Sequence, residues 1–276
     1  MIRGTTTLLA HFGDPIGIVK APMIYNPWFE SRGIDAAVVP MGVRADDYAV
    51  TMPAVFRFTN IRGALVTMPH KVTTVALLDD MSTTVKVAQS CNAVLKRADG
   101  TLYGEMFDGA GFVRGLALKG VRLAGASALV VGAGGVGSAI AASLAAAGVA
   151  RLVLFDTREA IAESLAARLR QHYPALDARP GPADPAGFDV AVNATPLGMN
   201  ASDPMPFDVT RLASTTFVGE VVMKQAITPL LRVARERGCG TQVGTDMLFE
   251  QIPLYLSFFG FGDATADELR AVARLA

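Results

Sequence analysis

Short apolar runs alternate with stretches of helical periodicity along the first hundred residues of the chain. Four runs have the length and composition of β-strands: 36–40, 61–67, 92–95 and 102–104. Pro69 follows the second run and ends it, and the Asp99-Gly100 turn between the last two predicts a β-hairpin. This alternation of strands with helices favours an α/β layer architecture.

The pattern changes near Gly109, where a linking helix is predicted over 111–118. Beyond it lie four strand-like runs, at 128–131, 152–155, 190–193 and 216–218, and three predicted helices, at 138–147, 159–172 and 228–237. After Gly244 the chain is helical again. We therefore expect one domain formed by residues 1–108 together with 244–276, and a second domain, residues 109–243, inserted into it.

A glycine-rich segment, Gly132-Ala133-Gly134-Gly135-Val136-Gly137, opens the inserted domain directly after a four-residue apolar strand. Gly132 permits a tight turn, Gly134 lets the backbone approach a pyrophosphate, and Gly137 allows close packing of the following helix. The N-terminus of that helix offers free N–H groups and the positive end of its dipole. Asp156 stands at the end of the next strand, where a ribose-binding acidic residue is expected. The segment predicts a Rossmann-like site for a nicotinamide dinucleotide.

Asp156 also bears on the choice of cofactor. A carboxylate at this strand end accepts hydrogen bonds from the ribose 2′-hydroxyl and repels a 2′-phosphate, so NAD is favoured. NADP stays possible, because Arg158 stands two residues later and could cover a 2′-phosphate.

Composition and charge narrow the class of partner to small molecules. The 276 residues are 51% apolar and carry no formal net charge, so no basic field attracts nucleic acid or an anionic membrane. The two cysteines, Cys91 and Cys239, suit a reducing compartment. The alanine-rich run 139–147 is too short to span a bilayer, and the N-terminus lacks a signal-peptide pattern. We expect a cytoplasmic protein without a metal; a homodimer is compatible with the sequence.

A hydride transfer at a secondary alcohol requires a group that moves the proton on the oxygen. Lys71 follows the predicted strand 61–67 closely, and Asp108 lies where the first domain meets the second. Ligand sites concentrate at such junctions, and a lysine–aspartate pair could hold and tune the proton donor.

Several ordered motifs resemble those of the shikimate/quinate dehydrogenase family over nearly the whole chain. They are Gly13–Ile16 with Lys20–Asn26, Val66–Lys71, Asn92, Gly104–Gly111, Asn193–Met199, Thr228–Leu231 and Met247–Gln251. The resemblance implies an α/β substrate domain, completed by C-terminal helices, that carries an inserted Rossmann-like NAD(P)-binding domain. It also implies reversible hydride transfer between NAD(P) and a ring hydroxyl of shikimate, quinate or a related compound, with 3-dehydroshikimate reduced in the opposite direction.

The resemblance also assigns roles to residues. It implies Lys71 as the catalytic lysine, Asp108 as its partner, and Thr67, Asn92 and Gln251 as groups that hold the substrate ring. Around the cofactor it implies the glycines named above and a second set of residues: Asp156, Asn193, Thr195, Met223 and Met247. The two methionines could equally fill gaps in the core.

Other positions depart from the family's pattern. Val19 and Ala21 replace two serines that bind the substrate carboxylate, Leu65 replaces an asparagine, and Met223 replaces a tyrosine. Burying a carboxylate without donors is costly, unless Lys20 supplies a compensating charge. We therefore expect a substrate that carries a different group at its carboxylate end.

Two alternatives remain open on the same fold. The chain could be an NAD(H)-responsive binding or regulatory protein without turnover, or a dehydrogenase for a substrate that lacks a carboxylate. The histidines add no candidate: His70 is expected to point away from the site, and His11 and His172 fit surface or boundary positions.

Overall fold

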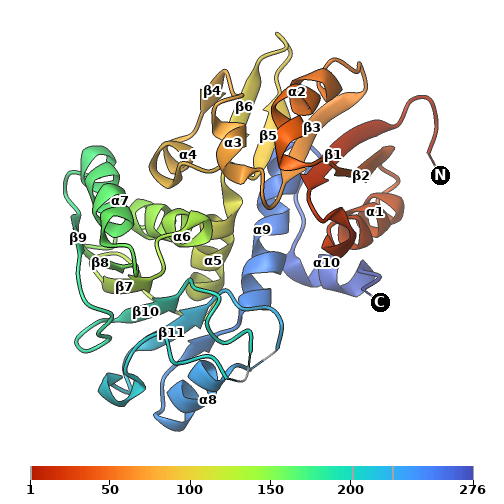
Figure 1. The fold of residues 1–276 in the computed structure, drawn as a ribbon. Helices are drawn as coiled ribbons and strands as arrows, with labels where there is room; N and C mark the ends of the chain where they lie inside the picture. The colour runs from red at the N-terminus through yellow and green to blue at the C-terminus, as the bar shows by residue number, and fades with distance from the viewer. Residues whose placement is uncertain (1, 201, 226, 276) are drawn as a thin grey trace. The chain divides into compact units, whose positions relative to one another are not determined.

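A computed structural model describes residues 2–200, 202–225 and 227–275, and it divides the chain into two compact units. The first unit comprises Met1–Phe107 and Ile252–Ala276, and the second comprises Asp108–Gln251. The second division falls within helix α9 (Gly244–Phe258), whereas the sequence places the boundary at the start of that helix. Figure 1 shows the order of the elements by colour.

The first unit is built on a mixed six-stranded sheet with the strand order β2-β1-β3-β5-β6-β4. Its strands are β1 (Thr7–Gly13), β2 (Ala36–Gly42), β3 (Ile61–Val66), β4 (Asp80–Met81), β5 (Ala93–Lys96) and β6 (Leu102–Glu105). The strands β2, β1 and β3 are parallel, so their carboxyl ends meet at one edge. The expected hairpin is present as the antiparallel pair β5 and β6.

Helices cover both faces of this first sheet. They are η1 (Ile16–Ile18), α1 (Pro22–Ser31), α2 (Ala45–Val55), α3 (Lys71–Val75), α4 (Thr83–Ala88) and α10 (Ala266–Val272), together with the last residues of α9. The ring of Phe12 on β1 contacts Tyr48 of α2 at 5.6 Å between centroids, which places α2 on the face to which Phe12 points. On the other face, a Cβ at Gly63 would overlap the ring of Phe259, so the end of α9 packs there.

The second unit is a wholly parallel six-stranded sheet with the order β12-β11-β10-β7-β8-β9. Its strands are β7 (Ser127–Val131), β8 (Arg151–Phe155), β9 (Asp177–Pro180), β10 (Val190–Asn193), β11 (Phe217–Glu220) and β12 (Thr241–Gln242). Its helices are α5 (Phe107–Leu118), α6 (Gly135–Ala146), α7 (Glu159–His172), η2 (Val209–Arg211), α8 (Pro229–Glu236) and the first part of α9. Helices α6 and α7 lie on one face and α8 on the other (Figure 1). The two-domain α/β fold expected from the sequence is confirmed.

Glycines on α5 explain how tightly its surroundings pack within the second unit. A Cβ at Gly109 would overlap the backbone of Ala139 on α6, and one at Gly111 would lie 2.7 Å from Gln251 Cβ on α9. These separations are shorter than van der Waals contact, so only glycine lets the helices approach this closely. Helix α5 begins at Phe107 rather than at residue 111, and Asp108 therefore lies inside its first turn.

None of the helices in the described part of the chain is long and apolar enough to cross a membrane.

Candidate active site

Three of the predicted substrate-site positions converge at the carboxyl edge of the first sheet. Thr67 follows β3 directly, and its N–H donates to Phe12 O at 2.9 Å. The Lys71 carbonyl, at the start of α3, accepts from Cys91 N at 2.8 Å, and the Asn92 carbonyl accepts from Val66 N at 2.9 Å. These backbone bonds tie the segments of Thr67, Lys71 and Asn92 together across two strands.

Asn92 is held from several sides. Its side chain is 1% exposed, and its Oδ1 accepts a hydrogen bond of 2.9 Å from Phe107 N. Its carbonyl also accepts from the hydroxyl of Tyr255 on α9 at 3.3 Å. A buried asparagine that is fixed in this way presents its amide group in a constant direction, which suits a residue that orients a ligand.

Asp108 and Gln251 are the first and the last residue of the second unit in sequence. Asp108 is 5% exposed in the first turn of α5, and Gln251 is 8% exposed on α9. The Gln251 Oε1 is buried and has no hydrogen-bond partner among the described residues. A buried acceptor of this kind normally has a partner, so a bound ligand is a natural donor for it.

The two positions at which the resemblance expects serines carry no hydrogen-bonding side chain. Val19 follows η1 and Ala21 precedes α1, and both are half-buried, whereas Lys20 between them is exposed. The structure therefore leaves this part of the first unit without the two hydroxyl donors.

The glycine-rich loop has the geometry that a dinucleotide requires. Gly132 has φ +99°, and a Cβ there would lie 2.9 Å from the backbone of Ala194, so this position admits only glycine. A Cβ at Gly137 would overlap the Gly132 carbonyl, whereas Gly134 faces open space. No side chain caps α6 at Gly134, which leaves the helix N-terminus open to a pyrophosphate. Gly135 begins the helix, and the loop would hold the phosphates of NAD or NADP.

Asp156 comes directly after β8 and is oriented by the same loop. Its Oδ2 accepts from Ala133 N at 2.9 Å, and its Oδ1 accepts from Arg158 N at 3.0 Å. Burial alone would raise the pKa of Asp156, but the two N–H groups and the Arg158 guanidinium outweigh it and lower that pKa. The carboxylate is therefore charged at neutral pH. It lies at the glycine-rich loop, where it would accept hydrogen bonds from the ribose of a dinucleotide.

Asn193 and Thr195 organise a second loop beside the glycines. Asn193 Oδ1 accepts from Thr195 N at 3.1 Å and from Thr195 Oγ1 at 2.6 Å, and its Nδ2 donates to Leu197 O at 2.9 Å. Ala194 and Thr195 lie against Gly132. The two polar side chains therefore hold the backbone of this loop in place.

The two methionines differ in their surroundings. Met223, which follows β11, is 48% exposed, whereas Met247 on α9 is 3% exposed. Met223 therefore offers its side chain to solvent or to a ligand, and Met247 fills the interior.

Sequence reasoning missed Glu220, a fully buried carboxyl group at the end of β11. Its Oε2 accepts from Thr228 Oγ1 at 2.9 Å. Burial raises the pKa of Glu220 to about 7, although the Thr228 and Asn193 side chains partly oppose this. A glutamate at a strand end carries no sequence signal of burial, because the neighbouring loops that cover it are distant in sequence.

The expectation for His11 was wrong. It is 7% exposed on the central strand β1, not at a surface or boundary position. Its neighbours in register, Pro40 and Leu65, come from two other strands, and this packing buries it. His70 is also buried: its ring stacks on Tyr48 at 4.0 Å, and its Nε2 lies 2.8 Å from Val43 O.

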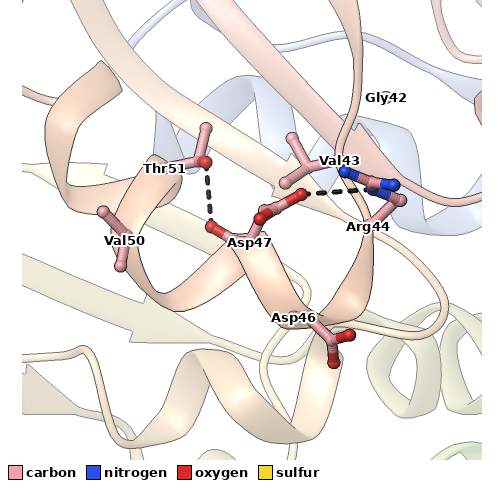
Figure 2. A pocket seen from close by; sticks show the side chains of 7 residues that line it. All are labelled: Gly42, Val43, Arg44, Asp46, Asp47, Val50 and Thr51. Carbon is pink, nitrogen blue, oxygen red and sulfur yellow. Dashed lines mark hydrogen bonds and ion pairs between the residues drawn. The ribbon is translucent and has the colours of Figure 1, made fainter.

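A separate hollow of about 480 Å³ lies on the first unit, between the end of β2 and α2 (Figure 2). Within it, Arg44 pairs with Asp47 at 3.2 Å. It contains none of the predicted site residues. Among the described residues, no group of three or more histidine, cysteine or acidic side chains could hold a metal ion.

The parallel sheet with its glycine-rich loop and terminal aspartate defines the class: a two-domain protein with a dinucleotide-binding unit. Comparison with known proteins agrees. Residues 12–94 match the family model described as "Shikimate dehydrogenase substrate binding domain", and residues 116–174 match that of the ThiF family. The chain is 34% identical over 275 residues to a protein from Acidiphilium cryptum named shikimate dehydrogenase (NADP(+)), covering 99% of this chain and 98% of that protein. This chain belongs to the shikimate dehydrogenase family, as the resemblance predicted.

Solved structures give the same fold. Shikimate 5-dehydrogenase from Listeria monocytogenes, in complex with shikimate and NAD, superposes with a TM-score of 0.91 at 26% identity, covering 98% of this chain and 97% of the other. The ligand-free 5-ketofructose reductase of a Gluconobacter strain superposes with a TM-score of 0.88 at 25% identity, covering 98% and 99%. Quinate dehydrogenase from Corynebacterium glutamicum, in complex with NAD, has a TM-score of 0.86 at 29% identity, covering 97% and 98%.

Proposed function

We propose that this protein catalyses reversible hydride transfer between a nicotinamide dinucleotide and a hydroxyl group of a polyhydroxylated small molecule. The observation that carries the proposal is the convergence of Thr67, Lys71 and Asn92 at one sheet edge of a chain whose second unit has an intact dinucleotide loop. Relatives across the family are named for the dehydrogenation of shikimate.

The proposed mechanism gives each residue one task. The nicotinamide ring supplies the hydride chemistry when it is bound. Lys71 takes the proton from the substrate hydroxyl and returns it in the reverse direction. The family resemblance implies Asp108 as the partner that stabilises the charge of Lys71. Asn92 and Thr67 hold other hydroxyl groups of the substrate. The family resemblance implies Gln251 for the same task, and its buried Oε1 has no hydrogen-bond partner among the described residues.

The substrate follows from what is missing at Val19 and Ala21. Shikimate and quinate carry a carboxylate, which needs donors or a counter-charge when it is bound. The two aliphatic side chains provide neither, so we infer that a polyhydroxylated compound without a carboxylate binds better than the acids. The 5-ketofructose reductase among the structural neighbours is named for such a neutral sugar.

For the cofactor we propose a preference for NAD. The charged Asp156 carboxylate at the glycine-rich loop accepts from a ribose 2′-hydroxyl and repels a 2′-phosphate. The names of the curated relatives specify NADP(+), and solved structures of neighbours hold either NAD or NADP. Arg158, which is exposed beside Asp156, is the group that would favour NADP.

Initial rates with a small substrate panel test the proposal. Shikimate and quinate would be oxidised with NAD and with NADP, and 5-ketofructose would be reduced with NADH and with NADPH. We expect turnover of at least one compound, with a higher kcat/KM for the neutral compound than for the acids. Tight NADH binding without turnover of any of the three would instead support the non-catalytic, nucleotide-responsive alternative.

A further inference from the structure

The central strand of the first sheet carries a buried histidine beside the proposed substrate site. On β1, Phe12 points toward α2, so its neighbour His11 points to the opposite face. Residues paired in a parallel sheet share a face, and His11 is paired with Leu65. Thr67 lies on the same face, because a Cβ at Gly13 would meet the Thr67 methyl group. His11 and Thr67 therefore lie on one face, near the carboxyl ends of β1 and β3.

The His11 imidazole is only 7% exposed, and its Nδ1 is buried without a hydrogen-bond partner among the described residues. The side chains that flank it in register, Pro40 and Leu65, are both apolar and cannot supply one. Leaving a buried polar atom unpaired destabilises the folded protein. A histidine that is kept at such a position is explained if a ligand completes its hydrogen bonding.

The chemistry of the imidazole limits what that ligand group can be. Burial, and next the charge of Lys71, lowers the pKa of His11 to about 4. The ring is therefore neutral near pH 7, and it offers a hydrogen bond rather than a counter-charge. A neutral hydroxyl or carbonyl oxygen suits it better than a carboxylate. The influence of Lys71 also shows that the imidazole lies within electrostatic reach of the proposed proton-transfer residue.

We propose that His11 is a specificity-determining residue, whose Nδ1 forms a hydrogen bond with an uncharged hydroxyl or keto group of the polyhydroxylated substrate. This assignment rests on the proposed function, because it places the substrate beside Lys71. It adds to that function a polar contact with the substrate on β1, in place of the two that are missing at Val19 and Ala21. The site then selects neutral polyols because the His11 imidazole that contacts them carries no charge.

Two substitutions separate this role from a structural one. His11→Leu removes the polar ring and keeps the volume of the side chain, whereas His11→Asn keeps a polar atom near the position of Nδ1. Because Nδ1 has no partner among the described residues, we expect the melting temperature of His11→Leu to equal or exceed that of the wild type. His172→Leu, at a half-buried position on α7 of the second unit, is the matched control.

The decisive measurement is calorimetric titration into each variant with the cofactor in the unreactive redox state, 5-ketofructose with bound NAD and shikimate or quinate with bound NADH, together with the steady-state kinetics. We expect 5-ketofructose to bind the wild type and to bind His11→Leu at least tenfold more weakly. His11→Asn should recover most of the affinity, and His172→Leu should match the wild type. KM should rise with kcat less affected, since His11 does not move the proton.

Three results would overturn the inference. The first is an affinity of His11→Leu within twofold of the wild type, and the second is a lower melting temperature with unchanged affinity, which would show a purely structural histidine. The third is the absence of binding of any of the three compounds to the wild type. Binding that depends on His11 without turnover would instead contradict the proposed function alone, because the titration does not depend on catalysis.

Discussion

Replacing Glu220 by glutamine should alter how stability depends on pH. The carboxyl group is fully buried at the end of β11, and burial raises its pKa from 4.5 to about 7. The folded protein therefore binds a proton more tightly than the unfolded chain does. Stability from this group is fully present below pH 4.5, is lost as pH rises toward 7, and is constant above that. Because one pKa unit corresponds to about 1.4 kcal/mol, the loss amounts to at most about 3 kcal/mol.

Glu220→Gln keeps an oxygen that can accept the hydrogen bond from Thr228 but cannot ionise. We therefore expect the variant to gain stability relative to the wild type as pH rises, by up to about 3 kcal/mol between pH 4.5 and pH 8. Urea unfolding, followed by far-ultraviolet circular dichroism at a series of pH values, measures this difference. Glu236→Gln, on the exposed side of α8, is the control and should follow the wild type. An equal difference between Glu220→Gln and the wild type at pH 5 and pH 8 would refute the reasoning.

Two further predictions concern the dinucleotide loop. Gly137→Ala places a Cβ on the Gly132 carbonyl, so the melting temperature should fall and NADH binding, measured by fluorescence titration, should weaken at least tenfold. Position 134 faces open space, so Gly134→Ala should keep the melting temperature of the wild type. Equal melting temperatures for the two variants would contradict this view of the loop. Asp156→Ser should increase kcat/KM for NADP relative to kcat/KM for NAD at least tenfold. An unchanged ratio would show that Asp156 does not distinguish the ribose hydroxyl from its phosphate.

Local patterns predicted most strands of both units but missed β9 and β12 of the second unit. Helix 159–172 and strand 190–193 were placed at their observed bounds, because unbroken periodic or apolar runs define them. Helix α6 begins three residues before the predicted start, at Gly135. Glycine is a weak helix former, so the sequence pattern gives no helical signal there. Strand β1 was not predicted, since its buried residues do not alternate with polar ones.

Some residues of the candidate site could be predicted from the sequence, and others could not. Motif residues such as Lys71 and the glycines of the loop can be recognised from short segments, because their spacing along the chain is itself the signal. The burial of His11 and Glu220 arises from register and packing between distant segments, so no local pattern reveals it.

Lys71 is the group proposed to move the substrate proton, and the mechanism depends on it more than on any other residue. The direct test is the initial rate of the panel compounds with NAD(H) for the wild type, Lys71→Ala and Lys71→Arg, with NADH binding measured alongside. We expect kcat to fall at least a hundredfold in both variants while the affinity for NADH, which binds in the second unit, stays within about twofold. Full activity in Lys71→Ala would contradict the proposed mechanism.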